Sequence, residues 1–167
     1  MLTVLIYLAA IVAANLTVAL FGPAMSIVNA FLFIGLDLTT RDRLHDAWRG
    51  RWLWPKMAAL IATGSAISWL LNRDAGQIAL ASLVAFAAAG AVDAVAYHLL
   101  RFRTWRTRVN GSNVLAAAVD SLVFPTLAFG ALLPWIVLGQ FAAKVAGGVL
   151  WAELLARKSS LTLNGLG

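Results

Sequence analysis

Four ionisable side chains lie within or at the ends of otherwise apolar stretches of this sequence, where a charge needs a partner or a function. They are Asp37, Asp93, Asp120 and Lys144. An ionisable group near the centre of a membrane helix costs roughly 2.5 to 3.5 kcal/mol on insertion scales, so such groups generally face a protein interior or a cavity. Because one lysine cannot neutralise three carboxylates, we predict a polar, water-accessible cavity for a small ligand.

Neutral polar and aromatic side chains recur at helical spacing beside these groups and extend them into stripes. Asn29, Phe33 and Asp37 are four residues apart, as are Gln140 and Lys144, and residues at this spacing share one face of a helix. We expect these stripes to line the cavity. The other members of the predicted stripes are Asn15, Asp93, Tyr97, Asn113 and Asp120.

A purely structural role is the alternative for the same residues. Lys144 would then neutralise one aspartate, and the remaining polar groups would only join helices. Asp37 would pair with Arg41 at the membrane interface, since residues four apart are neighbours on a helix. The sequence leaves both interpretations open.

Catalytic and metal-binding chemistry has little support in the sequence. The chain has no cysteine, and its two histidines, His45 and His98, lack metal-ligand spacing. No phosphate-binding loop, serine-hydrolase motif or zinc-protease motif occurs, and no aspartyl-protease motif surrounds Asp93 or Asp120. We therefore predict a protein that is not an enzyme and that has no metal and no cofactor.

The elements that must position these residues are long apolar segments. Of the 167 residues, 62% are hydrophobic and 12% are charged, against roughly 45 to 50% and about 25% in soluble domains. We predict an all-α integral membrane protein, a compact bundle of six transmembrane helices in one domain over residues 1–158, with a short cytoplasmic tail at 159–167. The predicted helices span about 2–20, 24–40, 53–71, 77–99, 113–133 and 135–155.

The distribution of positive charge predicts the orientation of this bundle. Of the 13 Lys and Arg residues, 11 fall after the second, fourth and sixth helices, and positively charged loops are retained in the cytoplasm. Both termini are therefore predicted to be cytoplasmic. After the second helix, Leu44, Trp48 and Trp52 recur every four residues between arginines, which predicts a short interfacial helix.

The basic segment "RFRTWRTR" at 101–108 resembles a nucleic-acid patch, but it joins two spanning segments. Its position favours contact with anionic lipid, so the expected partner is the lipid bilayer and not nucleic acid. Small residues four apart, Ala9 with Ala13 and Ala81 with Ala85, let helix backbones approach closely. These contacts could lie within the chain or form a homodimer, and both remain open.

Several segments, in order along the chain, resemble the motifs of the VUT family of vitamin uptake transporters, now associated with queuosine precursor transport. They are "FLFIGLDLTTRD" (31–42), "DAVAYHLLRFRTWRTR" (93–108), "SNVLAAAVDSLVFPTLAF" (112–129) and "GQFAAK" (139–144). The resemblance extends from about residue 7 to 150. It implies a transporter of the bacterial plasma membrane that imports 7-deazapurines such as preQ0 or preQ1.

The implied ligand has a guanine-like edge, whose N1–H and 2-amino group can donate two charge-assisted hydrogen bonds to a carboxylate. Lys144, Gln140 or an asparagine would donate to O6, and Phe33, Tyr97 or Phe124 would stack on the ring. Because no ATP-binding motif occurs, a secondary, ATP-independent mechanism is expected. The alternative is a binding module, similar to the substrate-binding component of energy-coupling-factor transporters, that needs a separate energising partner.

Overall fold

The computed structural model describes residues 2–33 and 52–164, and within these ranges the regular structure is entirely helical. The fold is therefore the predicted all-α class. The predicted interfacial helix, Asp37 and Arg41 lie outside the described residues. The helices are α1 (Leu2–Phe21), a helical segment at Ala24–Phe33, α3 (Leu53–Leu71), α4 (Gly76–Leu99), α5 (Trp105–Phe129) and α6 (Pro134–Asn164), with two short 3-10 turns, η1 (Arg73–Ala75) and η2 (Leu100–Phe102).

Three stretches of the described chain are long and apolar enough to cross a membrane: Leu2–Phe21, Arg73–Phe102 and Asn110–Phe129. Three shorter apolar stretches, Ala24–Phe33, Pro55–Leu71 and Pro134–Leu150, lie between or after them. Since roughly 20 apolar residues span the hydrocarbon core as a helix, the three long stretches meet the requirement on their own. The chain is a multi-pass helical membrane protein by this length and composition.

The first, third and fourth helices begin and end within a residue or two of the predicted bounds, whereas the fifth does not. α5 begins at Trp105 and not near 113, because the side chain of Thr104 accepts a hydrogen bond from the Thr107 backbone N–H (3.3 Å) and caps the helix. It ends at Phe129 because Gly130 adopts a left-handed conformation (φ 67°), which glycine reaches without steric cost.

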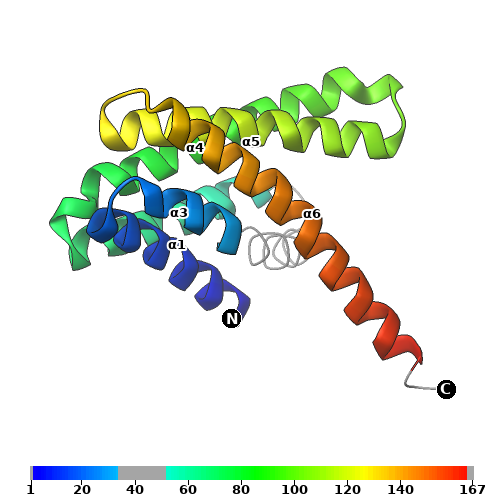
Figure 1. The fold of residues 1–167 in the computed structure, drawn as a ribbon, viewed down its shortest axis with the longest axis horizontal. Helices are drawn as coiled ribbons and strands as arrows, with labels where there is room; N and C mark the ends of the chain where they lie inside the picture. Colours follow the sequence, from blue (N-terminus) through cyan, green and yellow to red (C-terminus); the bar gives the residue numbers. More distant parts are fainter. Residues whose placement is uncertain (1, 34–51, 165–167) are drawn as a thin grey trace.

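The last helix also extends beyond its predicted end near 155 and reaches Asn164. Its final part projects past the other helices in Figure 1. Good helix formers such as leucine, alanine and arginine dominate "AELLARK", which explains the continued helix. The helix does not show where the bilayer ends, so the domain boundary at 158 and the orientation of the termini stay predictions.

Most of the main helix contacts join helices that follow one another along the chain, whereas α1 packs against α3, beyond the segment Ala24–Phe33. α4 and α5 run side by side over most of their length, and α1 with α3, α3 with α4, and α5 with α6 form the other main contacts (Figure 1). Two apolar clusters fill the interior, one around Tyr7, Met57 and Ile61 and one around Val18 and Ile78. These clusters hold α1, α3, α4 and α5 together.

Candidate functional site

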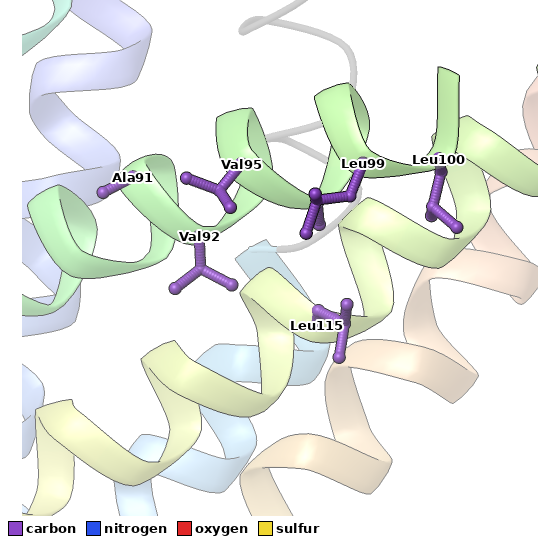
Figure 2. Close-up of a pocket in the computed structure, with 7 residues that line it drawn as sticks. Ala91, Val92, Val95, Leu99, Leu100 and Leu115 are labelled. Atoms are coloured by element: carbon purple, nitrogen blue, oxygen red, sulfur yellow. The ribbon is translucent and has the colours of Figure 1, made fainter. Parts of the chain in front are cut away.

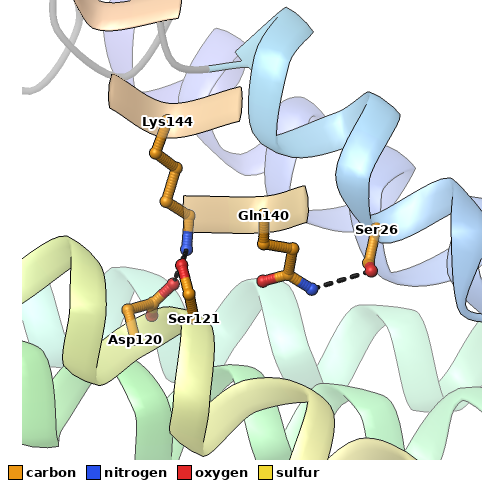
Figure 3. Close-up of polar contacts among 5 residues, drawn as sticks. All are labelled: Ser26, Asp120, Ser121, Gln140 and Lys144. Atoms are coloured by element: carbon orange, nitrogen blue, oxygen red, sulfur yellow. Dashed lines mark hydrogen bonds and ion pairs between the residues drawn. The ribbon is translucent and has the colours of Figure 1, made fainter. Parts of the chain in front are cut away.

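An ion pair between α5 and α6 is the centre of the candidate site. Lys144 Nζ donates to Asp120 Oδ2 and lies 3.3 Å from Ser121 Oγ (Figure 3). The exposed fractions of the lysine and aspartate side chains are 15% and 30%, so both are largely enclosed. Charge-assisted hydrogen bonds of this kind are among the strongest in proteins.

The pair lies in the middle of apolar sequence on both helices. Asp120 is the eleventh of the 20 residues in Asn110–Phe129, and Lys144 is the eleventh of the 17 in Pro134–Leu150. A charge at such a depth is expensive unless it is paired or faces a cavity. The arrangement therefore places a partly exposed acceptor and donor within the apolar stretches of α5 and α6.

Pro125 adds an unusual backbone feature next to this pair. It lies inside α5 and is buried. Because proline has no N–H, the carbonyl of Ser121, four residues earlier, loses its helical donor. Ser121 is itself fully buried, and its hydroxyl faces Lys144. The Ser121 carbonyl thus lacks its usual helical donor, one turn before Pro125.

One turn before Lys144 on the same face of α6, Gln140 connects this helix to the segment Ala24–Phe33. Gln140 is 2% exposed, and its Nε2 donates to Ser26 Oγ at 2.7 Å (Figure 3). Ser26 Oγ in turn donates to the carbonyl of Pro23 at 2.5 Å. Gln140 and Lys144, which were predicted to share one face of α6, therefore contact two different elements. Gln140 contacts the segment Ala24–Phe33, and Lys144 contacts α5.

Asn29 and Asn15 extend the polar contacts to α1 and α3. Asn29 Nδ2 donates to the Ala14 carbonyl (3.1 Å) and to Thr17 Oγ1 (2.9 Å). Asn15 Nδ2 donates to Ser68 Oγ at 3.2 Å, and both residues are buried. For these two asparagines the helix-joining alternative fits the observed contacts. These contacts form four separate groups: Asn15 with Ser68, Thr17 with Asn29, Ser26 with Gln140, and Lys144 with Asp120 and Ser121. We call the four groups together the polar chain.

The predicted residues of α4, Asp93 and Tyr97, take no part in the hydrogen bonds described above. Asp93 is partly buried, and its Oδ1 is buried without a hydrogen-bond partner among the described residues. Tyr97 is 38% exposed, with the guanidinium of Arg108 4.3 Å from its ring centroid. Asn113, near the start of α5, is exposed. Asp93 is thus a second carboxylate with unused hydrogen-bonding capacity, whereas Tyr97 is occupied by a cation.

The two predicted phenylalanines differ in their surroundings. Phe124 packs against the apolar cluster of Val18 and Ile78 and makes an edge-to-face contact with Phe129, with centroids 6.3 Å apart. This is a core position. Phe33 is partly buried at the end of the described segment. Phe124 therefore makes packing contacts, and the ligand contacts of Phe124 and Phe33 stay predictions.

Four hydroxyl residues of the polar chain did not appear in the sequence prediction: Thr17, Ser26, Ser68 and Ser121. Two could have been found from spacing. Ser26 lies three residues before Asn29, and Ser121 follows Asp120 and precedes Pro125 by four residues, the spacing at which proline frees a carbonyl. Ser68 and Thr17 carry no such signal, because neither lies at helical spacing from a predicted site residue or four residues before a proline.

No group of three or more His, Cys, Asp or Glu side chains that could hold a metal ion occurs in the described part of the chain. His98 instead shares a 2.8 Å hydrogen bond with Arg101 on the exposed end of α4. The chemistry available at the site is thus hydrogen bonding and charge pairing.

A set of apolar helices joined by buried polar contacts, with a lysine and an aspartate paired within the apolar stretches, defines a multi-pass helical membrane protein. The chain belongs to the putative vitamin uptake transporter family, whose sequence pattern matches residues 1–156. The resemblance drawn from the motifs is confirmed by this match. No curated protein and no solved structure gives a significant match. The family places the chain among membrane transporters that take up small molecules.

Proposed function

We propose that this transporter imports queuosine precursors, 7-deazapurines such as preQ0 or preQ1, across the bacterial plasma membrane. The observation that carries the proposal is the Asp120, Lys144 and Ser121 group between α5 and α6. A deazaguanine edge presents two parallel N–H donors and one carbonyl acceptor. The aspartate supplies the acceptors and the lysine supplies the donor, so the group has the complementary pattern.

Selectivity follows from the same chemistry. A ligand that enters between Asp120 and Lys144 must replace their mutual contact with equivalent hydrogen bonds, because buried polar groups left unpaired cost about 1 to 3 kcal/mol or more when charged. A purine without the 2-amino group or O6 offers fewer of these bonds. Deazaguanines are therefore preferred over adenine-like compounds.

The other predicted contacts complete the proposed site. Asp93, with its unpartnered oxygen, is the second carboxylate available to the ligand. Phe33 is the favoured stacking residue, and base stacking contributes roughly 1 to 3 kcal/mol. The remaining candidate contacts are Asn15, Asn29, Asp37, Tyr97, Asn113, Phe124 and Gln140.

The proposed mechanism is secondary and ATP-independent, with alternating access to the site. The Asp120 and Lys144 contact holds the empty protein closed at mid-depth, and the ligand exchanges with this contact when it binds. Both termini face the cytoplasm in this proposal, and metabolic use of the precursor or a coupled proton maintains inward flux.

A binding module that needs an energising partner is the rival proposal, supported by the small size of the helical domain. Measuring preQ0 binding and uptake by liposomes that contain only the purified chain would distinguish the binding module from the autonomous transporter. Accumulation of preQ0 inside the liposomes supports an autonomous transporter. Saturable binding without accumulation supports the module.

Uptake in cells tests the substrate class. In a bacterium that cannot make queuosine precursors and lacks its own importer, expression of the chain with supplied preQ0 or preQ1 should restore queuosine in tRNA. Asp120→Asn should lower this restoration at least tenfold, because an amide cannot accept both donors as a charged pair. Asp74→Asn is the matched control, since Asp74 lies exposed in η1.

Failure of every precursor to restore queuosine, with the chain present in the membrane, would rule out this substrate class. Equal loss with Asp74→Asn and Asp120→Asn would instead show that the ion pair has no special part in uptake.

A further inference from the structure

A hydrophobic groove lies along α4 and α5, and none of its lining residues belongs to the polar chain. Its volume is about 460 Å³ (Figure 2). Several lining side chains are well exposed, including Leu99 at 71%, Val95 at 59% and Leu115 at 50%. The lining consists of Ala91, Val92, Val95, Ala96, Leu99, Leu100 and Leu115.

The length of this groove matches one leaflet of a bilayer. Ala91 and Leu99 are eight residues apart on α4, which is about 12 Å at 1.5 Å per residue. Half of the roughly 30 Å hydrocarbon core is about 15 Å. A single acyl chain of one leaflet could therefore lie along the groove from the headgroup level toward mid-membrane.

The groove ends at a strongly basic turn. Leu99 and Leu100 lead directly into Arg101 and Arg103, both of which are exposed. Arg101 is held over the Phe102 ring, 4.7 Å from the centroid. No acidic residue occurs in the sequence between Asp93 and Asp120, whereas four arginines do. The end of the groove is thus complementary to a negatively charged headgroup.

We propose that this groove binds one anionic phospholipid of the bilayer, with an acyl chain against Val92, Val95 and Leu115 and the phosphate at Arg101 and Arg103. The apolar length alone would accept any phospholipid. The arginines add the preference for a negative headgroup, because basic residues at the membrane surface attract anionic lipids. This lipid site is separate from the ligand site and does not depend on the transported substrate.

Native mass spectrometry of the detergent-purified chain tests the proposal with phosphatidylglycerol and phosphatidylcholine of identical acyl chains. We expect one retained phosphatidylglycerol and weaker retention of phosphatidylcholine. Arg101→Gln and Arg103→Gln should each lower phosphatidylglycerol affinity about fivefold. Arg73→Gln, an exposed arginine at the other end of α4, should leave it unchanged.

Val95→Trp, which fills the groove, should reduce the retention of both lipids, while size-exclusion chromatography monitors folding. Equal retention of the two lipids by the unchanged chain would overturn the proposal, as would an Arg73→Gln effect equal to that of Arg101→Gln. Loss of a dimer in Val95→Trp, with lipid retention unchanged, would also overturn it and assign the groove to a second copy of the chain.

Discussion

At the scale of single residues, the Asp120 and Lys144 pair joins two roles that the sequence left as alternatives. Lys144 neutralises an aspartate, as the structural interpretation requires. The same two groups are partly exposed and carry the acceptor and donor chemistry of the proposed ligand site. Neutralisation and binding are therefore compatible: a pair that stabilises the empty protein is also one that a complementary ligand can exchange with.

Double-mutant analysis of this pair separates stability from binding. Lys144→Met leaves Asp120 unpaired and should lower the free energy of unfolding in detergent by about 1 to 3 kcal/mol. The combination Asp120→Asn with Lys144→Met removes both charges and should recover most of this loss. Ligand binding, measured by isothermal titration calorimetry, should remain lost in both variants. Additive stability losses in the double variant would contradict this pairing.

The residue scale also shows which contacts sequence alone could identify. The common face of Gln140 and Lys144 followed from their spacing of four. Spacing could not show that Lys144 pairs with Asp120 and not with Asp93. That choice depends on which helix packs against α6. Phe124 likewise has the spacing and aromatic character of a ligand contact, yet it packs into the apolar cluster near Val18.

At the scale of elements, the hydrogen bonds of the polar chain join helices to one another, and glycine allows one of these close approaches. A Cβ added at Gly139 of α6 would lie 2.5 Å from Ile27 Cδ1 on the neighbouring segment. The same close approach brings Gln140, the next residue, to Ser26. The lack of a side chain at Gly139 thus permits the hydrogen bond between Gln140 and Ser26.

Gly139→Ala tests this dependence. Replacing glycine by alanine in a helix normally stabilises by up to about 1 kcal/mol, but crowding against Ile27 should cancel the gain or reverse it by about 1 to 3 kcal/mol. Gly148→Ala on the same helix is the control, since nothing lies within 4 Å of its added Cβ. Thermal unfolding in detergent should rank Gly148→Ala above Gly139→Ala. An equal shift for both would contradict the close approach.

Helix boundaries could be predicted where the composition changes sharply. They were harder to predict where a capping side chain determines the first residue of the helix. The bounds of α3 agree with the prediction from its apolar stretch. The start of α5 is set by the Thr104 side chain, nine residues before the predicted start of the apolar helix at 113, so hydrophobicity gave no sign of it. Polar residues such as Asn110 and Asn113 are consequently helical.

At the scale of the whole molecule, the helical class and the multi-pass character followed from composition, because 62% apolar residues in long runs leave few alternatives. The predicted orientation of the helices in the membrane depends on the distribution of basic residues, and the arrangement of the helices does not test it. The absence of cysteine from the natural sequence offers a direct measurement of it.

Single-cysteine labelling should establish the topology. Phe102 lies 85% exposed in η2, and Leu132 lies 59% exposed in the turn between α5 and α6. With both termini cytoplasmic, a membrane-impermeant maleimide should label Leu132→Cys in intact cells and Phe102→Cys only after permeabilisation. The unsubstituted chain, which has no thiol, is the background control. The reverse pattern would place both termini outside.

The ion pair between α5 and α6 also has an electrical consequence. If access alternates as proposed, Asp120 and Lys144, both ionised, together contribute no net charge to the movement of the site through the membrane field. Moving one elementary charge across 100 mV involves about 2.3 kcal/mol. The pair itself should therefore add no sensitivity to the membrane potential, and any voltage dependence of uptake would come from the ligand, a coupled ion or another charge of the proposed site such as Asp93.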